Sequence, residues 1–301
     1  MISASALEAR RRDVRRVLLI TLAANLIVVV AKALAGFSAH SLSVIADAAH
    51  SSIDAWNNVM ALALARVAAK APDAEHPYGH AKFETLGALA IVAFLSITVF
   101  QLVVSALTRL FGSGGHPQAT PLVMAVMVAS ALISFIVATY EDHYGRRHQS
   151  EILIADAAHT RSDVYSSIAV LIGIALVALG YARADALVTL LVAAVIARAG
   201  WLILQRNIPI LVDERAFEED AVRSIALSTT GVLDCFAVRS RGRAGEVFVE
   251  LTITVPPALN VQEGHLIADS VERRVAGQLG AREVVVHVEP HESDQQAQSA
   301  S

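Results

Sequence analysis

The 301-residue chain is strongly apolar, with 55% hydrophobic and only 17% charged residues, a balance typical of membrane proteins rather than of soluble domains. Its single cysteine, Cys235, excludes an intrachain disulfide framework and a cysteine-rich zinc site. The formal net charge of −4 hides an acidic C-terminal part: residues 207–301 carry 8 basic and 15 acidic side chains, which argues against nucleic acid as a partner.

In chain order, the first element is a polar and basic segment, residues 1–16, without a convincing signal-peptide cleavage site. Apolar segments follow that are long enough to cross a hydrocarbon layer of about 30 Å as helices. Together they predict a six-helix transmembrane domain over residues 17–206, with spans at about 17–37, 41–66, 82–111, 119–142, 151–179 and 184–206.

Basic side chains gather in residues 1–16 and in the loops 66–82 and 143–150, and are sparse in the loops on the opposite side. Loops rich in arginine and lysine stay in the cytoplasm, so both termini are predicted to be cytoplasmic. The excess of arginine over lysine points to a bacterial source and therefore to the inner membrane. Lys32, inside the first span, is expected to snorkel or to pair with a polar group.

After the last span the composition changes to that of a small soluble domain, residues 207–290. Its pattern predicts a helix at 216–229, strands at 232–240 and 245–255, a helix at 261–280 and a strand at 283–289. This αββαβ order is typical of a split βαβ arrangement in a small α+β domain. Residues 291–301, rich in serine, glutamine and alanine, are expected to be a disordered tail.

One short phrase occurs twice within the apolar part of the chain. His50 precedes Asp54 by four residues in the second span, and His159 precedes Asp163 by four residues in the fifth. Residues four apart lie on one face of a helix. Because an ionisable group in hydrocarbon is costly, it normally faces a partner, a cavity or an ion.

The second and fifth spans run in opposite directions, so both phrases reach the middle of the bilayer, with His50 opposite Asp163 and Asp54 opposite His159. Two imidazoles and two carboxylates in a tetrahedral array suit Zn²⁺ best, with Cd²⁺, Co²⁺ or Fe²⁺ as plausible alternatives, whereas Mn²⁺ and Mg²⁺ favour oxygen ligands. The plainer alternative is a set of interhelical hydrogen bonds between buried polar groups.

Two further carboxylates, Asp47 and Asp156, stand three residues before the two histidines and share their helix faces. They are candidates for holding the ligands in place or for lining the path of the ion. Only neutral imidazole coordinates a metal, so protons compete with the cation. Helices that rock between two openings would then give alternating access and metal/proton exchange.

An intramembrane zinc enzyme could use the same four ligands. Against it, the chain contains no His-Glu-x-x-His sequence, no further general base stands beside the ligands, and four protein ligands close the zinc shell. We therefore expect a transporter rather than an enzyme.

The loop 66–82 contains a second candidate cation site, formed by Asp73, His76 and His80. A turn that starts the next helix, with Pro77 and Gly79, explains part of the same sequence.

In the C-terminal domain, His287 and Glu289 share one strand face and His265 lies on the preceding helix, which makes a third and weaker candidate. His265 could equally be a solvated helix residue.

Over about residues 14–290 the chain resembles the cation diffusion facilitators, and the zinc-type exporters among them. The resemblance rests on the two His-x3-Asp phrases, on residues 76–82, on the six spans and on the αββαβ domain. It implies a homodimeric metal/proton antiporter in the lipid bilayer, with a ferredoxin-like cytoplasmic domain that binds metal and helps to dimerise. It also implies the transport-site ligands His50, Asp54, His159 and Asp163.

The same resemblance implies a loop site at Asp73, His76 and His80, and a pairing of Lys82 with Asp213 at the dimer contact. His265, His287 and Glu289 fall where relatives bind metal in the cytoplasmic domain. The chain has Phe236 and Glu250 where some relatives carry further histidines. A single weak site is therefore expected there in place of a two-metal cluster.

Overall fold

The structure is a computed structural model, and it describes residues 4–38, 42–111, 121–179, 181–243 and 246–291. The chain divides into a helical unit, Ala9–Ile208, and a second unit that contains Pro209–Ser301. Each unit is described by itself. Of the predicted disordered tail, residues 291–301, only His291 is described, and its N–H donates to the Val255 carbonyl at 2.8 Å.

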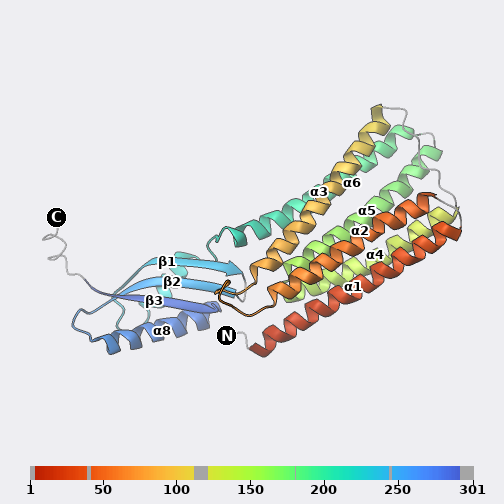
Figure 1. The fold of residues 1–301 in the computed structure, drawn as a ribbon. Coiled ribbons are helices and arrows are strands. Elements are labelled where there is room, and N and C mark those ends of the chain that lie inside the picture. Colours follow the sequence, from red (N-terminus) through yellow and green to blue (C-terminus); the bar gives the residue numbers. More distant parts are fainter. Residues whose placement is uncertain (1–3, 39–41, 112–120, 180, 244–245, 292–301) are drawn as a thin grey trace. The chain divides into compact units, whose positions relative to one another are not determined.

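The helical unit contains long helices that run side by side (Figure 1). They are α1 (Ala4–Ser38), α2 (Leu42–Ala68), α3 (Lys82–Phe111), α4 (Pro121–His148), α5 (Glu151–Ala178) and α6 (Ala182–Leu211). The predicted six-helix class is confirmed. Helix α1 begins at Ala4 rather than near residue 17, because the preceding alanine, leucine, glutamate and arginine residues are strong helix formers and extend it.

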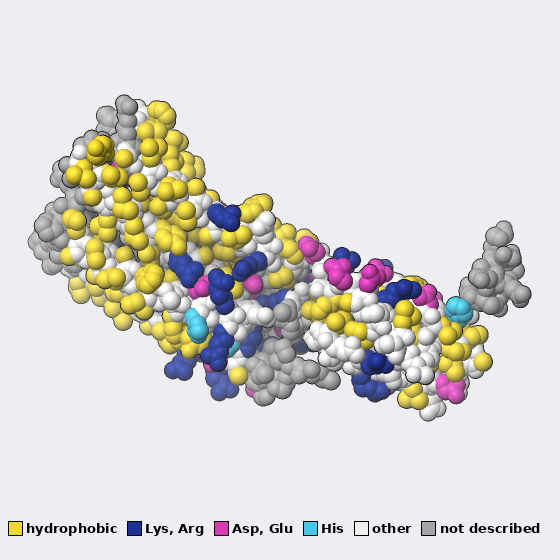
Figure 2. Space-filling view, turned by 180° about the vertical axis from the view of Figure 1, so that it is seen from behind, with side chains coloured by type: hydrophobic (Ala, Val, Ile, Leu, Met, Phe, Trp, Pro, Cys, Tyr) yellow, Lys and Arg dark blue, Asp and Glu magenta, His cyan; other side chains and the backbone are white. Residues whose placement is uncertain are grey.

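The face of the helical unit seen in Figure 2 is largely apolar. Within the described residues, segments of α1, α3, α4 and α6 are long and apolar enough to cross a membrane. They expose large side chains such as Ile27, Phe100, Ile136 and Leu191. Since a soluble surface rarely carries so large an apolar patch, this face suits lipid. Helices α2 and α5, which carry the two His-x3-Asp phrases, are not among those four.

Helix α5 lies inside the unit, packed against α3 and α4 and in contact with α2. Its residues Ile152 and Leu153 are fully buried together with Leu18 of α1 and Ile91 of α3. A glycine allows α3 to approach closely: a Cβ atom at Gly87 would lie 2.6 Å from Ile152 Cδ1. This packing fixes the face of α5 that meets α2.

The second unit has the predicted αββαβ order: α7 (Glu219–Leu227), β1 (Asp234–Arg243), β2 (Glu246–Val255), α8 (Val261–Leu279) and β3 (Glu283–Pro290). The sheet order is β1-β2-β3, with β1 antiparallel and β3 parallel to the central strand. Alternate residues of β2, including Val249 and Ile253, are buried against Val222 of α7 and Val271 of α8. The two helices therefore supply the core that covers the sheet.

Candidate metal sites

Helix α2 presents one polar face to α5. Asn57 and Asn58 follow Asp54 by three and four positions on this helix, so the three side chains lie on the same face. Asp54 Oδ1 lies 3.3 Å from Nε2 of His159, and Asn57 Nδ2 lies 3.0 Å from the same nitrogen. His159 is only 5% exposed. Asp54 and His159 thus face each other, the pairing that antiparallel packing of the two helices predicts.

Asp163, one turn further along α5, completes a group of three potential ligands. One ligand atom from each of Asp54, His159 and Asp163 lies within 4.8 Å of the other two. That spacing would let a single divalent cation contact all three side chains. The side chains of His50, the fourth predicted ligand, and of Asp47 lie outside the described residues.

A proton and a metal cation would compete for the same lone pair of His159 Nε2. An unprotonated Nε2 can accept a hydrogen bond from the amide of Asn57, and a protonated Nε2 can donate to Asp54. Only the unprotonated nitrogen coordinates a cation. Nδ1 of the same ring is buried and has no hydrogen-bond partner within the described part of the chain.

The three ligands line a cavity of about 350 Å³ between α1, α2, α3, α4 and α5. Its other walls are unusually polar for a membrane domain, with hydroxyl or amide groups from every one of these helices, among them Asn25, Ser51, Gln101, Ser130 and Thr160. Lys32 also lines the cavity, where it is 9% exposed and donates to Ser51 Oγ at 2.9 Å. Lys32 therefore pairs inside the protein and does not snorkel to its surface.

Asp156 lies beside this cavity rather than among the three ligands. Its carboxylate is fully buried and accepts a hydrogen bond from Asn58 Nδ2 at 2.8 Å. Asn58 in turn accepts from Asn25 Nδ2 at 2.5 Å. A polar layer thus connects α1, α2 and α5 next to the candidate site.

The loop between α2 and α3 forms a second group of three potential ligands, Asp73, His76 and His80. Asp73 contacts His76 Nδ1 through Oδ1 and His80 Nε2 through Oδ2, each at 3.3 Å. Gly79, at φ +89°, provides the left-handed turn between the two histidines, and its N–H donates to the His76 carbonyl. The backbone N–H of His76 holds the pKa of Asp73 below its ordinary value.

The residues proposed for a cytoplasmic site form two separate contacts in the single chain. His287 Nε2 lies 3.3 Å from Glu289 Oε1, and His265 Nε2 lies 3.7 Å from Asp269 Oδ1. Among the described residues, neither contact belongs to a group of three potential ligands. A metal site at these residues stays a prediction.

Asp213 lies in the second unit, 3.4 Å from Arg241, whereas Lys82 begins α3 of the helical unit and is exposed. Their pairing across a dimer likewise stays a prediction.

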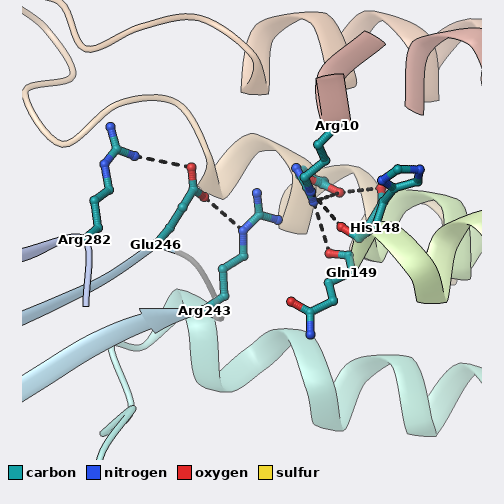
Figure 3. A network of polar contacts seen from close by, with 8 residues as sticks. Arg10, His148, Gln149, Arg243, Glu246 and Arg282 are labelled. Carbon is teal, nitrogen blue, oxygen red and sulfur yellow. Dashed lines mark hydrogen bonds and ion pairs between the residues drawn. The ribbon is translucent and has the colours of Figure 1, made fainter. Parts of the chain in front are cut away.

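Figure 3 shows two polar networks away from these sites, each within one unit. In the helical unit, Arg10 contacts Glu84 at 3.2 Å and donates to the carbonyl of His148 at 2.6 Å. In the second unit, Glu246 contacts both Arg243 and Arg282. Among the described residues, neither network belongs to a group of three potential ligands.

Comparison with known families decides the kind of protein. Residues 18–212 match the family described as the cation efflux transmembrane domain, and residues 215–291 match the cation efflux protein cytoplasmic domain. The chain belongs to the cation efflux family. The predicted resemblance to the cation diffusion facilitators is thereby confirmed, and the members of this family are transporters rather than enzymes.

Several curated relatives of this cation efflux protein match over most of its length. An uncharacterized transporter of Methanocaldococcus jannaschii is 28% identical, over 92% of this chain and 99% of that protein. Metal tolerance protein C1 of Arabidopsis thaliana is 34% identical over 87% of this chain, which spans only 59% of that longer protein. Manganese efflux system protein MneS of Bacillus subtilis is 28% identical over 91% of this chain and 94% of its own length.

Three polar residues of this cation efflux protein were not singled out from the sequence. Asn57 and Asn58 follow Asp54 by three and four positions, so the helix face of Asp54 was a signal that could have found them. Glu141 is fully buried on α4. Its position within the predicted span 119–142 was the corresponding signal, because a carboxylate in a membrane span usually has a partner or a function.

Proposed function

We propose that this protein exports divalent metal cations, Zn²⁺ foremost, from the cytoplasm in exchange for protons. The observation that carries the proposal is the close approach of Asp54, His159 and Asp163 on two helices of a membrane domain. Family membership supports cation efflux. The ligand geometry supports a site between α2 and α5 around which the helices give alternating access.

The choice of Zn²⁺ rests on the ligand types. With His50 as the fourth ligand, two imidazoles and two carboxylates favour Zn²⁺, and Cd²⁺, Co²⁺ and Fe²⁺ accept the same set. Mn²⁺ is the competing candidate, because two relatives are named for manganese efflux. A metal panel in a transport assay distinguishes these ions, and His50→Asp should shift the preference toward harder ions by replacing an imidazole with a carboxylate.

Coupling to protons follows from the chemistry of His159. Protonation of Nε2 removes the lone pair that the cation needs, so a proton taken up on one side of the membrane displaces the metal. Loss of that proton on the other side prepares the site for reloading. The basic loops 66–82 and 143–150 support a cytoplasmic position of both termini in a bacterial inner membrane.

Two further features belong to the same proposal. Asp73, His76 and His80 would bind a second cation in the loop, because their ligand atoms lie as close together as those of the membrane site. The cytoplasmic unit would join two copies into a homodimer, with Lys82 and Asp213 at the contact.

The test is metal flux into proteoliposomes that contain the purified full-length protein. Asp163→Asn should reduce Zn²⁺ flux to the level of protein-free vesicles, because the amide offers no anionic ligand. Asp142→Asn is the matched control: its carboxylate lies on α4 and pairs with Arg146 and Arg161, so flux should stay near that of the unaltered protein. Undiminished flux in Asp163→Asn would refute the site.

A further inference from the structure

Two carboxyl groups meet in the interior of the helical unit, outside the three metal ligands. Glu141 on α4 and Asp156 on α5 are both 0% exposed, and their carboxyl groups face each other closely enough to share a hydrogen bond if one of them carries a proton. Glu141 Oε1 and Asp156 Oδ1 are buried oxygens for which the described residues supply no donor. Neither carboxyl group has an arginine or lysine in ion-pair contact within the described part of the chain.

This contact requires a proton. Ionised carboxylates only accept hydrogen bonds, so two of them in contact repel each other and leave the contact without a donor. One proton on the pair removes the repulsion and supplies the donor, as in other pairs of carboxyl groups that share a site. The remaining contacts fit one shared proton, because Asn58 on α2 donates to Asp156 and the Thr160 hydroxyl on α5 lies 3.4 Å from Glu141 Oε2.

The groups that face the pair come from α1, α2 and α5. Helix α1 contributes the hydroxyl of Thr21, α2 the amide of Asn58 and, further away, the carboxylate of Asp54, and α5 the hydroxyl of Thr160 and the ring of His159. The titratable neighbours among these described side chains are therefore two proposed metal ligands. A cation bound by these ligands would therefore change the electrostatic potential at the Glu141–Asp156 pair.

The pair is also connected to the metal cavity. The Thr160 hydroxyl lies 3.4 Å from Glu141 Oε2 and 3.1 Å from the backbone carbonyl of Asp156, and Asn58 donates to Asp156 Oδ2 at 2.8 Å. Because the hydroxyl can give its one proton to the carbonyl, its oxygen can accept a proton from the Glu141 carboxyl group. Both donors line the cavity that Asp54, His159 and Asp163 share. A single layer of hydrogen-bonding side chains therefore lies between the pair and the space that the cation would occupy.

We propose that Glu141 and Asp156 form a proton-binding site of the transporter, which holds one proton while the metal site is empty and releases it into the cavity when a divalent cation binds. The inference rests on the proposed metal/proton exchange, and it adds a second proton-binding group beside His159. The O–H bond of the Glu141 carboxyl group breaks and its electron pair stays on the carboxylate. Thr160 accepts that proton on its hydroxyl oxygen and passes its own proton to a water molecule in the cavity.

Proton release tests the proposal on purified full-length protein in weakly buffered detergent solution. Zn²⁺ is added, and released protons are counted with a pH indicator while bound Zn²⁺ is measured in parallel. Glu141→Gln keeps the shape and can donate to Asp156, but it has no proton to lose. We expect this variant to bind Zn²⁺ with the stoichiometry of the unaltered protein and to release about one proton fewer per ion.

Asp142→Asn, the same type of change at the neighbouring position of α4, is the control and should release as many protons as the unaltered protein. Equal proton counts in Glu141→Gln and the control would overturn the proposal. If the unaltered protein binds no divalent cation, the proposed function fails, and the infrared measurement below then judges the proton pair by itself.

Infrared spectroscopy detects the proposed shared proton of Glu141 and Asp156 directly, and it needs no transport activity. At neutral pH the unaltered protein should show the C=O stretch of a protonated carboxyl group, because exposed carboxyl groups are ionised there. That band should be absent from Glu141→Gln and should decrease on addition of Zn²⁺ to the unaltered protein. A spectrum without such a band at neutral pH would refute the shared proton, even if the variant failed to fold.

Discussion

At the scale of single residues, Asp73 shows how a backbone hydrogen bond prepares a carboxylate for a cation. The His76 N–H donates to Asp73 at 2.8 Å and lowers the pKa of the carboxyl group from its ordinary 3.8. A lowered folded-state pKa means that this contact stabilises the loop fully above the unfolded value and is lost only as pH falls through the folded one. Asp73 therefore stays ionised in mild acid and remains available there as an anionic ligand for a cation.

Asp73→Asn should weaken Zn²⁺ binding to the loop by at least about tenfold, the loss seen even when residues that merely orient a metal ligand are changed. Titration calorimetry on full-length protein that also carries Asp54→Asn would isolate the loop from the membrane site. Glu75→Gln, an exposed carboxylate two positions away, is the control and should bind as before. Equal Zn²⁺ affinities in the two variants would show that Asp73 is no ligand and that the loop is a structural turn.

The sequence predicted the charged part of the membrane site better than its neutral part. Asp54 and His159 were placed opposite each other because helical spacing and antiparallel spans fix which faces meet. Asn57 and Asn58 were missed, because an amide in an apolar helix does not reveal its partner. The contact of Glu141 with Asp156 depends on how α4 packs against α5, which no local pattern encodes.

At the scale of elements, helix α8 shows a boundary that side chains determine. Asn260 accepts from the N–H of Glu263, and the Glu263 carboxylate accepts from the N–H of Asn260, each at 3.0 Å, a reciprocal cap of the helix N-terminus. Asn260→Ala should destabilise α8 by about 1 kcal/mol, whereas Asn260→Asp should retain most of the stability. Hydrogen exchange of the first-turn amides of α8 in the full chain would measure both effects, and unchanged exchange in Asn260→Ala would show that the cap contributes nothing.

Other boundaries were less predictable. The first helix of the second unit is expected at 216–229 and is formed by Glu219–Leu227, because Glu218 has extended backbone angles and ends the irregular segment before it. Helix α4 continues to His148, beyond the predicted residue 142, because the apolar pattern ends at the membrane surface while the helix does not. Apolar periodicity thus locates the buried stretch of an element and not its polar ends.

At the scale of the whole molecule, the expected homodimer depends on a contact between charges. Lys82→Asp and Asp213→Lys should each lower the dimer fraction, and the double variant should restore it. A surface ion pair contributes about 0.2–1 kcal/mol, so each single change should shift the dimer dissociation constant only a few-fold. Sedimentation in detergent measures this, with Arg241→Gln as the control, because Asp213 also contacts Arg241 within its own unit. A double variant as weak as the single ones would exclude the pairing.

The polar helices α2 and α5 also determine how such a chain must be made. A translocon releases a helix into lipid readily only when it is apolar, and carboxylates at the centre of a helix oppose that step. Helix α2 leaves the ribosome well before α5, so its Asp54 lacks the His159 imidazole until the fifth helix arrives. We therefore expect a late step of biogenesis in which α2 and α5 enter the membrane together, so that the proposed cation ligands would also govern correct insertion.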